Sequence, residues 1–345
     1  MRQTLVLALV GPLLVALAAT LSGCGGQLRE APEPSPLVWP APPDTPRIAL
    51  VRAFSRPAEL GIGRGLAERL QALLLGDRDT RMVRPMAVAV VRGVIYVADP
   101  GVQAVHRFDP AGDRYALVRG PGGTPLPSPV GLAEGAGGDV YVTDSRLGGV
   151  FVIRPDADAA SPVALDTAPR QPTGIAFDPD GRRLLVVDTA AHQILAYGPD
   201  LRLMARIGTG GNGPGEFNHP TALWRDPSGR LYVTDPLNFR IQILDADGTF
   251  LAAIGRAGDS PGDSPRPKGV ATDRDGHVFV VDALLHSVQI FDEAGRFLLP
   301  VGQQGQDRGE FWLPAGVFVS GDGHIYVADS YNRRVQVLRY LGGAT

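Results

Sequence analysis

Six times in this chain, a short run of β-branched and aromatic residues ends in an aspartate. The clearest copy is Ile325-Tyr326-Val327-Ala328-Asp329, which has the composition of a short strand. Successive copies are separated by 45, 44, 47, 47 and 47 residues. A fixed period of this length predicts a repeat architecture. The six repeated aspartates are Asp99, Asp144, Asp188, Asp235, Asp282 and Asp329.

Each unit has the same order of strand and turn signals. A proline introduces a first strand, as in residues 172–178, and an Asp/Gly turn leads to the second strand, which ends at the repeated aspartate. A polar turn leads to a third strand, as in residues 240–245, and a further turn leads to a fourth, as in residues 250–254. Four antiparallel strands per unit are typical of a propeller blade. The six units span residues 85–340, so the sequence predicts an all-β, six-bladed β-propeller.

The sixth unit is too short to supply its own fourth strand. Residues 47–54 form an isolated strand pattern far away in the sequence, and this strand can complete the last blade. Pairing the two ends of the chain would remove two exposed strand edges. We therefore predict that the propeller domain covers residues 47–345 and that residues 47–54 close the ring.

Residues 61–77 carry the clearest helical pattern. Leu66, Leu70, Leu73 and Leu74 recur at helical spacing. This predicts a helical insertion, which either packs across one face of the domain or docks on a partner.

The first 46 residues have the composition of an export signal and a linker. Residues 1–23 have a positive start and an apolar stretch, as in a secretory signal peptide. Leu21-Ser22-Gly23-Cys24 resembles the lipobox of bacterial lipoproteins, which implies that Cys24 is lipidated. Gly25, in place of aspartate, implies sorting to the outer membrane. An uncleaved transmembrane anchor is the alternative. Residues 24–46 are rich in proline and are expected to form an extended tether, with Trp39 docked on the propeller.

Composition excludes some partners. The formal net charge is −3, which argues against nucleic acid as a partner because such binding needs a basic excess. Cys24 is the only cysteine, so no disulfide can form within the chain.

Two connectors and two turns resemble the NHL-repeat family of six-bladed propellers. The connectors are residues 213–220 and 309–314, which contain Gly-Glu-Phe, two further residues and then proline. The turns are residues 235–243 and 329–337, which contain Asn, Arg and Gln at the family's spacing. The resemblance covers about residues 85–340 and implies a bacterial NHL-repeat lipoprotein. Family members include protein-binding scaffolds, RNA binders, ligand sensors and a metal-dependent lyase, so the fold does not select a function.

Metal chemistry is poorly supported by the sequence. The six aspartates could gather near the axis as a cation site, but their presence in every unit favours a structural role in each turn. His219 is the weak candidate for a metal ligand, since it is expected near the axis, and a zinc site usually needs three protein ligands. No nucleophile with a paired base can be assigned, and we expect no cofactor.

The loops after the second strands and before the first strands should share one rim of the ring. Aromatic residues interleaved with arginines there are typical of a protein-binding surface. Phe239 and Tyr331 could instead pack within their own turns. The candidate rim residues are Arg146, His192, Asn238, Phe239, Arg240, Lys268, His286, Trp312, Tyr331, Asn332 and Arg333.

The sequence thus predicts a monomeric, lipid-anchored, non-enzymatic propeller that binds another envelope or surface protein. A metal-dependent lyase or hydrolase with a site in the axial channel is one alternative. A small-ligand sensor is the other.

Replacing Cys24 with alanine is expected to release the protein from membranes, because durable attachment depends on the acyl chains carried by that residue. Fractionation of cells into membrane and soluble parts would measure the release. A Cys24→Ala protein that stays with the membranes would contradict the lipoprotein interpretation.

Overall fold

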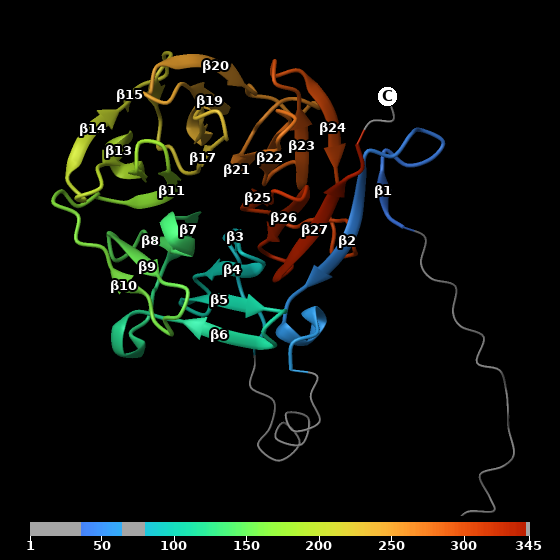
Figure 1. Ribbon diagram of the computed structural model, residues 1–345. Coiled ribbons are helices and arrows are strands. Elements are labelled where there is room, and N and C mark those ends of the chain that lie inside the picture. Colours follow the sequence, from blue (N-terminus) through green and yellow to red (C-terminus); the bar gives the residue numbers. More distant parts are fainter. Residues whose placement is uncertain (1–35, 64–79, 343–345) are drawn as a thin grey trace, which may run out of the picture. The chain divides into compact units, whose positions relative to one another are not determined.

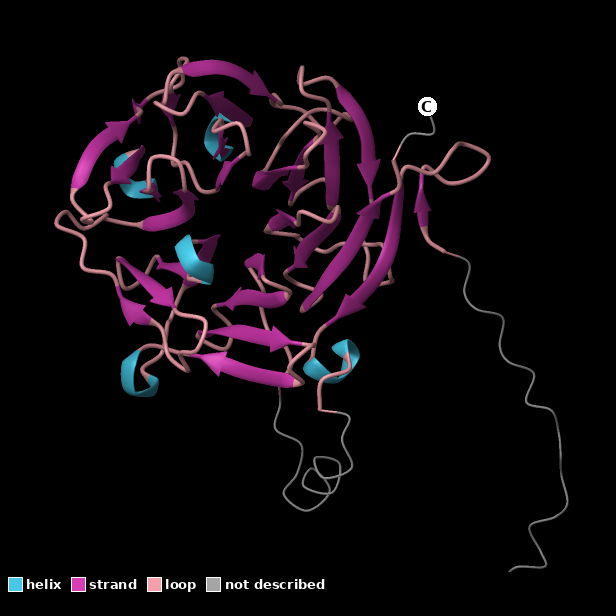
Figure 2. Ribbon diagram, viewed as in Figure 1, coloured by secondary structure: helices cyan, strands magenta, loops and turns pink. Residues whose placement is uncertain are grey.

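The computed structural model describes residues 36–63 and 80–342, and the described residues from Leu37 onwards belong to one compact unit. In this unit six antiparallel sheets are arranged around a central axis, as Figure 1 shows. Helical structure among the described residues is limited to single turns: η1 (Pro57–Leu60), η2 (Pro121–Gly123), η3 (Ala136–Gly138), η4 (Thr189–Ala191) and η5 (Pro236–Asn238) (Figure 2). The predicted six-bladed β-propeller is confirmed.

The strands of blades 1 to 3 follow one another in sequence from the axis outwards. Blade 1 contains β3 (Ala87–Val91), β4 (Val94–Asp99), β5 (Ala104–Asp109) and β6 (Arg114–Val118). Blade 2 contains β7 (Pro129–Glu134), β8 (Val140–Asp144), β9 (Gly149–Ile153) and β10 (Ser161–Pro162). Blade 3 contains β11 (Pro172–Asp178), β12 (Arg183–Asp188), β13 (Gln193–Tyr197) and β14 (Leu203–Ile207).

Blades 4 and 5 have the same order, and a small parallel pair precedes blade 4. That pair is β15 (Thr209–Gly210) and β16 (Glu216–Phe217). Blade 4 contains β17 (Leu223–Arg225), β18 (Leu231–Asp235), β19 (Arg240–Leu244) and β20 (Phe250–Ile254). Blade 5 contains β21 (Pro267–Thr272), β22 (Val278–Asp282), β23 (Ser287–Phe291) and β24 (Phe297–Val301).

Blade 6 is built from both ends of the chain. Its inner strands are β25 (Val317–Val319), β26 (His324–Asp329) and β27 (Arg334–Tyr340). The fourth strand is β2 (Ile48–Phe54), which pairs antiparallel with β27, so the predicted closing strand is confirmed. Figure 1 shows this blue strand beside the red C-terminal one.

A fifth strand, β1 (Val38–Trp39), lies outside β2. The Trp39 side chain packs against the core cluster of blades 5 and 6 and closely approaches Gly309. The compact unit therefore begins at Leu37, and residues 37–46, which we expected in the extended tether, belong to it. The proline-rich composition concealed this short pairing.

The middle strands are nearly continuous apolar runs because each blade is covered by a neighbour on both faces. All five residues of β22 are buried, and so are all five of β23. Clusters such as Phe54, Phe108 and Val335 join adjacent blades, here blades 6 and 1. Burial between blades thus stabilises the ring, consistent with the absence of any internal disulfide.

Glycines let the innermost strands meet at the axis. A Cβ at Gly174 would lie 2.6 Å from the backbone nitrogen of Leu223 in the next blade. A Cβ at Gly269 would lie 2.8 Å from the nitrogen of Val317. Only a residue without a side chain fits such a close backbone approach.

Three sequence predictions fall outside the described residues. The signal peptide (residues 1–23) and Cys24 lie there, as does most of the predicted helical insertion at 61–77. Among the helices that the structure describes, none is long and apolar enough to span a membrane.

Ring closure can be tested with two shortened chains. A chain that starts at Arg56 lacks β1 and β2, whereas one that starts at Arg47 lacks β1 only. Removing β2 takes the buried side chains of Ile48, Leu50 and Phe54 out of the core and should cost about 5 kcal/mol or more. Chemical denaturation should therefore show a large loss of stability, or aggregation, for the first chain and a much smaller loss for the second. Equal stability of the two chains would contradict closure by β2.

Candidate functional site

The repeated aspartates hold each blade together at one end. Asp329 is fully buried and accepts hydrogen bonds from the backbone N–H of Trp312 (2.9 Å), Asn332 Nδ2 (2.9 Å) and Arg334 Nε (2.8 Å). Trp312 lies in the connector before β25, whereas Asn332 and Arg334 lie beyond β26. The carboxylate thus ties the connector to the turn after the second strand. Burial raises the pKa of Asp329, and these hydrogen bonds act in the opposite direction.

The same bridge occurs in the other blades, with equivalent donors in blade 4 and with different donors elsewhere. Asp144 accepts from the backbone N–H groups of Ser128, Arg146 and Leu147. Asp99 accepts from Val83 and Arg84, and its pKa is lowered because hydrogen bonds, first that from His106, outweigh the effect of burial. None of the six aspartates lines the axial channel, so they are structural groups and not an axial cation site.

Because of these bridges, the connectors and the turns after the second strands lie on one face, which we call the connector face. Three predicted rim residues form side-chain hydrogen bonds within this face. Asn332 Nδ2 also donates to Gly305 O, and Asn238 makes the equivalent bond to Gly211 O. Arg240 donates to Asp235 and to two backbone oxygens of the connector. Asn238, Arg240 and Asn332 therefore hold the connector in place, and their contact with a partner stays a prediction.

Two glutamines of the turn motif complete this network, a role that we did not predict from the sequence. Gln336 Nε2 donates to Glu310 O (2.6 Å), and its Oε1 accepts from the N–H of Gly309 (2.9 Å). Gln242 makes the equivalent bonds to Glu216 O and the N–H of Gly215. The signal was present, because glutamine follows the arginine of the turn at fixed spacing in both units.

The fourth residue after each aspartate has a left-handed backbone in all six blades: Gln103, Gly148, His192, Phe239, His286 and Arg333. The two histidines at this position link adjacent blades. His192 Nδ1 accepts from the N–H of His219, and His286 Nδ1 accepts from the N–H of Leu313, both at 3.1 Å.

His219 does not lie at the axis, as we had expected. Its ring packs against His192 with 4.3 Å between ring centroids, and neither histidine lines the channel. Among the described residues, the one group of three possible metal ligands within 4.8 Å of each other is Asp273, Asp275 and His277, in the hairpin of blade 5.

The connector face presents apolar side chains to solvent. Tyr331 is 56% exposed, Phe239 40% and Trp312 38%, so neither Phe239 nor Tyr331 packs fully within its own turn. The rings of Trp312 and Tyr331 lie 6.3 Å apart. Further exposed apolar residues on this face are Val83, Leu147, Leu237 and Leu284.

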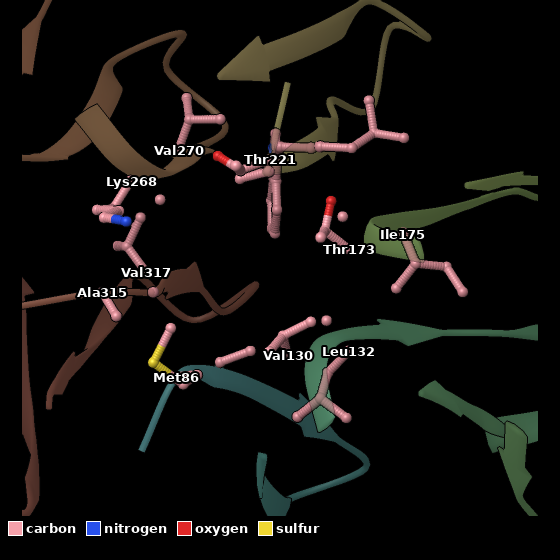
Figure 3. Close-up of a pocket in the computed structure, with 18 of the residues that line it drawn as sticks. Met86, Val130, Leu132, Thr173, Ile175, Thr221, Lys268, Val270, Ala315 and Val317 are labelled. Atoms are coloured by element: carbon pink, nitrogen blue, oxygen red, sulfur yellow. The ribbon is translucent and has the colours of Figure 1, made fainter. Parts of the chain in front are cut away.

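The axial channel is lined by two rings of side chains from the innermost strands and the residues that precede them (Figure 3). Its volume is about 200 Å³, and it is open to solvent. Lys268, which we expected on the rim, lies in the first ring. That ring contains Met86, Val130, Thr173, Thr221, Lys268 and Ala315. The second ring is entirely aliphatic: Val88, Leu132, Ile175, Leu223, Val270 and Val317.

A larger bowl of about 740 Å³ lies at the other end of the innermost strands. Trp224 contributes to the walls of both cavities, donates a hydrogen bond to Thr272 and makes an edge-to-face contact with Phe318. Arg225 in the bowl forms an ion pair with Asp178 of the neighbouring blade at 3.0 Å. Glu134 is exposed and lines the bowl. Partial burial raises the pKa of Glu134, and the charge of Arg92 acts in the opposite direction.

Comparisons with known proteins agree with this architecture. A family model for the NHL repeat matches residues 311–338, which contain the last connector and most of blade 6. This chain is a six-bladed β-propeller that contains an NHL repeat. A search of curated protein sequences found no match.

Several solved structures share the fold. An auxiliary nutrient binding protein from Bacteroides thetaiotaomicron is 12% identical, with a TM-score of 0.60 over 76% of this chain and 70% of that one. The virginiamycin B lyase from Staphylococcus aureus is 14% identical, with a TM-score of 0.54 over 75% and 96%. A chain of a nidogen/laminin complex is 20% identical, with a TM-score of 0.50 over 63% and 80%. At these identities the similarity shows the fold alone.

The buried ion pair in the bowl allows us to predict how the free energy of unfolding changes in acid. Burial acts to raise the pKa of Asp178, but hydrogen bonds from Arg183 and Gly181 and the charge of Arg225 outweigh it, so the pKa lies below its ordinary value of 3.8. A lowered pKa stabilises the folded state fully above about pH 4 and progressively less as the pH falls further. Asp178→Asn should therefore lower the free energy of unfolding at pH 7 by about 2–4 kcal/mol and flatten its decline in acid.

Asp180→Asn is the matched control, because Asp180 pairs with the same Arg225 but its side chain is 81% exposed. Its loss should cost less than about 1 kcal/mol. Denaturation series at neutral and acidic pH would measure both variants. Equal effects of the two substitutions would show that the buried pair is not the stabilising one.

Proposed function

We propose that this protein is a binding propeller of the cell envelope and that another protein docks on its connector face. The observation that carries the proposal is the repeated exposure of large apolar side chains at equivalent turns. The second or third residue after the aspartate is apolar and more than half exposed in four blades, as Leu147, Leu237, Leu284 and Tyr331. Apolar residues gathered on one face mark interaction sites more often than scattered ones do.

Trp312 and Tyr331 are the best candidates for the centre of this interface. The two rings face the same solvent region, and the backbone beneath them is fixed, because Tyr331 N–H donates to Trp312 O and Trp312 N–H donates to Asp329. Rigid aromatic side chains lose little conformational entropy on binding and dominate many interfaces. Arg146 and Arg333 are also exposed on this face and can supply polar contacts at its edge.

The channel supports a catalytic function less well. The described residues of its two rings supply one titratable side chain, Lys268, with aliphatic and hydroxyl groups around it. Metal-dependent hydrolysis or elimination would require several converging ligands. The export signal and lipidated Cys24 belong to the proposal as well, since they would keep the propeller at the envelope membrane.

Cross-linking in intact cells tests this function. The unmodified protein should yield one stoichiometric partner. The double variant Trp312→Ala/Tyr331→Ala should lose most of it, because anchor residues each contribute about 2 kcal/mol or more to binding. The matched control is Met204→Ala/Leu251→Ala, which removes exposed apolar side chains from the outer strands β14 and β20.

The control should keep the partner, and thermal denaturation should show that both variants fold. Recovery of the same partner by both double variants would refute docking on the connector face. A partner lost from the control and kept by the Trp312/Tyr331 variant would move the interface to the outer strands.

A further inference from the structure

Lysine occurs once in this chain, at position 268, against 32 arginines (33 basic residues less one). That single lysine lies in the first ring of the axial channel. Its side chain makes no hydrogen bond or ion pair with any residue that the structure describes. Figure 3 shows its nitrogen among the side chains around the cavity.

The surroundings of Lys268 disfavour an unpaired charge. Burial lowers the pKa of Lys268, the charge of Arg266 lowers it further, and Asp282 acts in the opposite direction. Asp282 forms no ion pair with Lys268, and its oxygens accept hydrogen bonds from the N–H groups of Arg266, Leu284 and Leu285. Lys268 is partly buried. An ammonium partly removed from water without a partner is destabilising, so this position gains from an added anion.

The rest of the cavity restricts which anion fits. Its volume is about 200 Å³, and the second ring is aliphatic throughout, with Val88, Val270 and Val317 at most 8% exposed. A doubly charged anion would place one charge against this apolar ring at a high desolvation cost. An anion with one charged end and an apolar body matches both rings.

Thr221 supplies a second polar group. It lies in the same ring, one blade away from Lys268, and its hydroxyl is shielded from water and has no hydrogen-bond partner among the described residues. Because Thr221 lines the cavity, rotation about its Cα–Cβ bond would bring the hydroxyl to the cavity. A ligand oxygen there would satisfy a donor that now has none.

We propose that the axial channel binds a small monocarboxylate with a short aliphatic chain. The carboxylate pairs with the Lys268 ammonium and accepts a hydrogen bond from the Thr221 hydroxyl. The aliphatic chain packs against Leu223, Val270 and Val317 of the second ring. This site goes beyond the proposed docking function and uses none of the exposed residues of the connector face.

The single lysine makes the test direct. Lysine labelled with ¹³C at Cε should give one side-chain resonance from the chain. Butyrate should shift this resonance and bind measurably by calorimetry. Butyramide, which has the same shape and no charge, should bind at least about tenfold more weakly, because hydrogen bonds to a charged group are the strong ones. Acetate, which lacks most of the apolar chain, should also bind more weakly than butyrate.

Two variants distinguish the loss of ligand contacts from the loss of the folded structure. Lys268→Met keeps the unbranched apolar stem and should abolish butyrate binding, while thermal stability stays the same or rises because an unpaired charge is removed. Thr221→Val keeps the shape of the side chain and should weaken binding by less than Lys268→Met does. Trp312→Ala/Tyr331→Ala should leave butyrate binding unchanged, which distinguishes this site from the docking face.

Three results would overturn the proposal. The first is a Cε resonance that does not respond to saturating butyrate. The second is equal binding of butyrate and butyramide. The third is a folded Lys268→Met protein that binds butyrate as tightly as the unmodified one.

Discussion

A buried carboxylate at the end of each second strand is the interaction on which this propeller depends. It joins two segments that are 16 to 18 residues apart, the connector that starts a blade and the turn after its second strand, as in the pairs Ser128–Asp144 and Arg170–Asp188. A carboxylate has enough lone pairs to accept from both segments at once. The bridge thus fixes where each innermost strand begins. Together with the glycines at the axis, it sets the geometry of the channel and of the connector face.

Because some residues of each turn form these internal hydrogen bonds, the remaining ones are more available to bind a partner. Asparagine, arginine and glutamine of the turn are used inward in blades 4 and 6, where Asn332, Arg334 and Gln336 all reach Asp329. The second residue after the aspartate is exposed in every blade, and its identity varies, from Arg146 in blade 2 to Tyr331 in blade 6. A surface built in this way can acquire aromatic or aliphatic side chains without disturbing the fold, because the backbone beneath it is held by the network.

The sequence was sufficient to predict the six blades and the closing strand, because the period of about 47 residues and the missing fourth strand can both be recognised along the chain without knowledge of its folding. It was not sufficient to place individual side chains. Lys268 follows a proline at the start of a first strand, and the register of that strand shifts between Pro267 and Val270. Such a bulge breaks the alternation of faces, so position along the strand does not tell whether a side chain points to the rim or to the axis. His219 was misplaced for a related reason: its positive φ turns the connector towards His192.

The choice of lysine at position 268 follows from the same geometry. An arginine there would bring a planar group with five donors into a cavity of about 200 Å³ above an aliphatic ring, where most of those donors would lack partners. A lysine presents a compact charge with three donors at the end of a flexible stem, and one carboxylate can satisfy it. The aliphatic ring below excludes water from one side of that pair, which strengthens the attraction between the two charges. The feature that makes an unpaired Lys268 unfavourable is therefore the same one that would make its pairing with a small monocarboxylate selective.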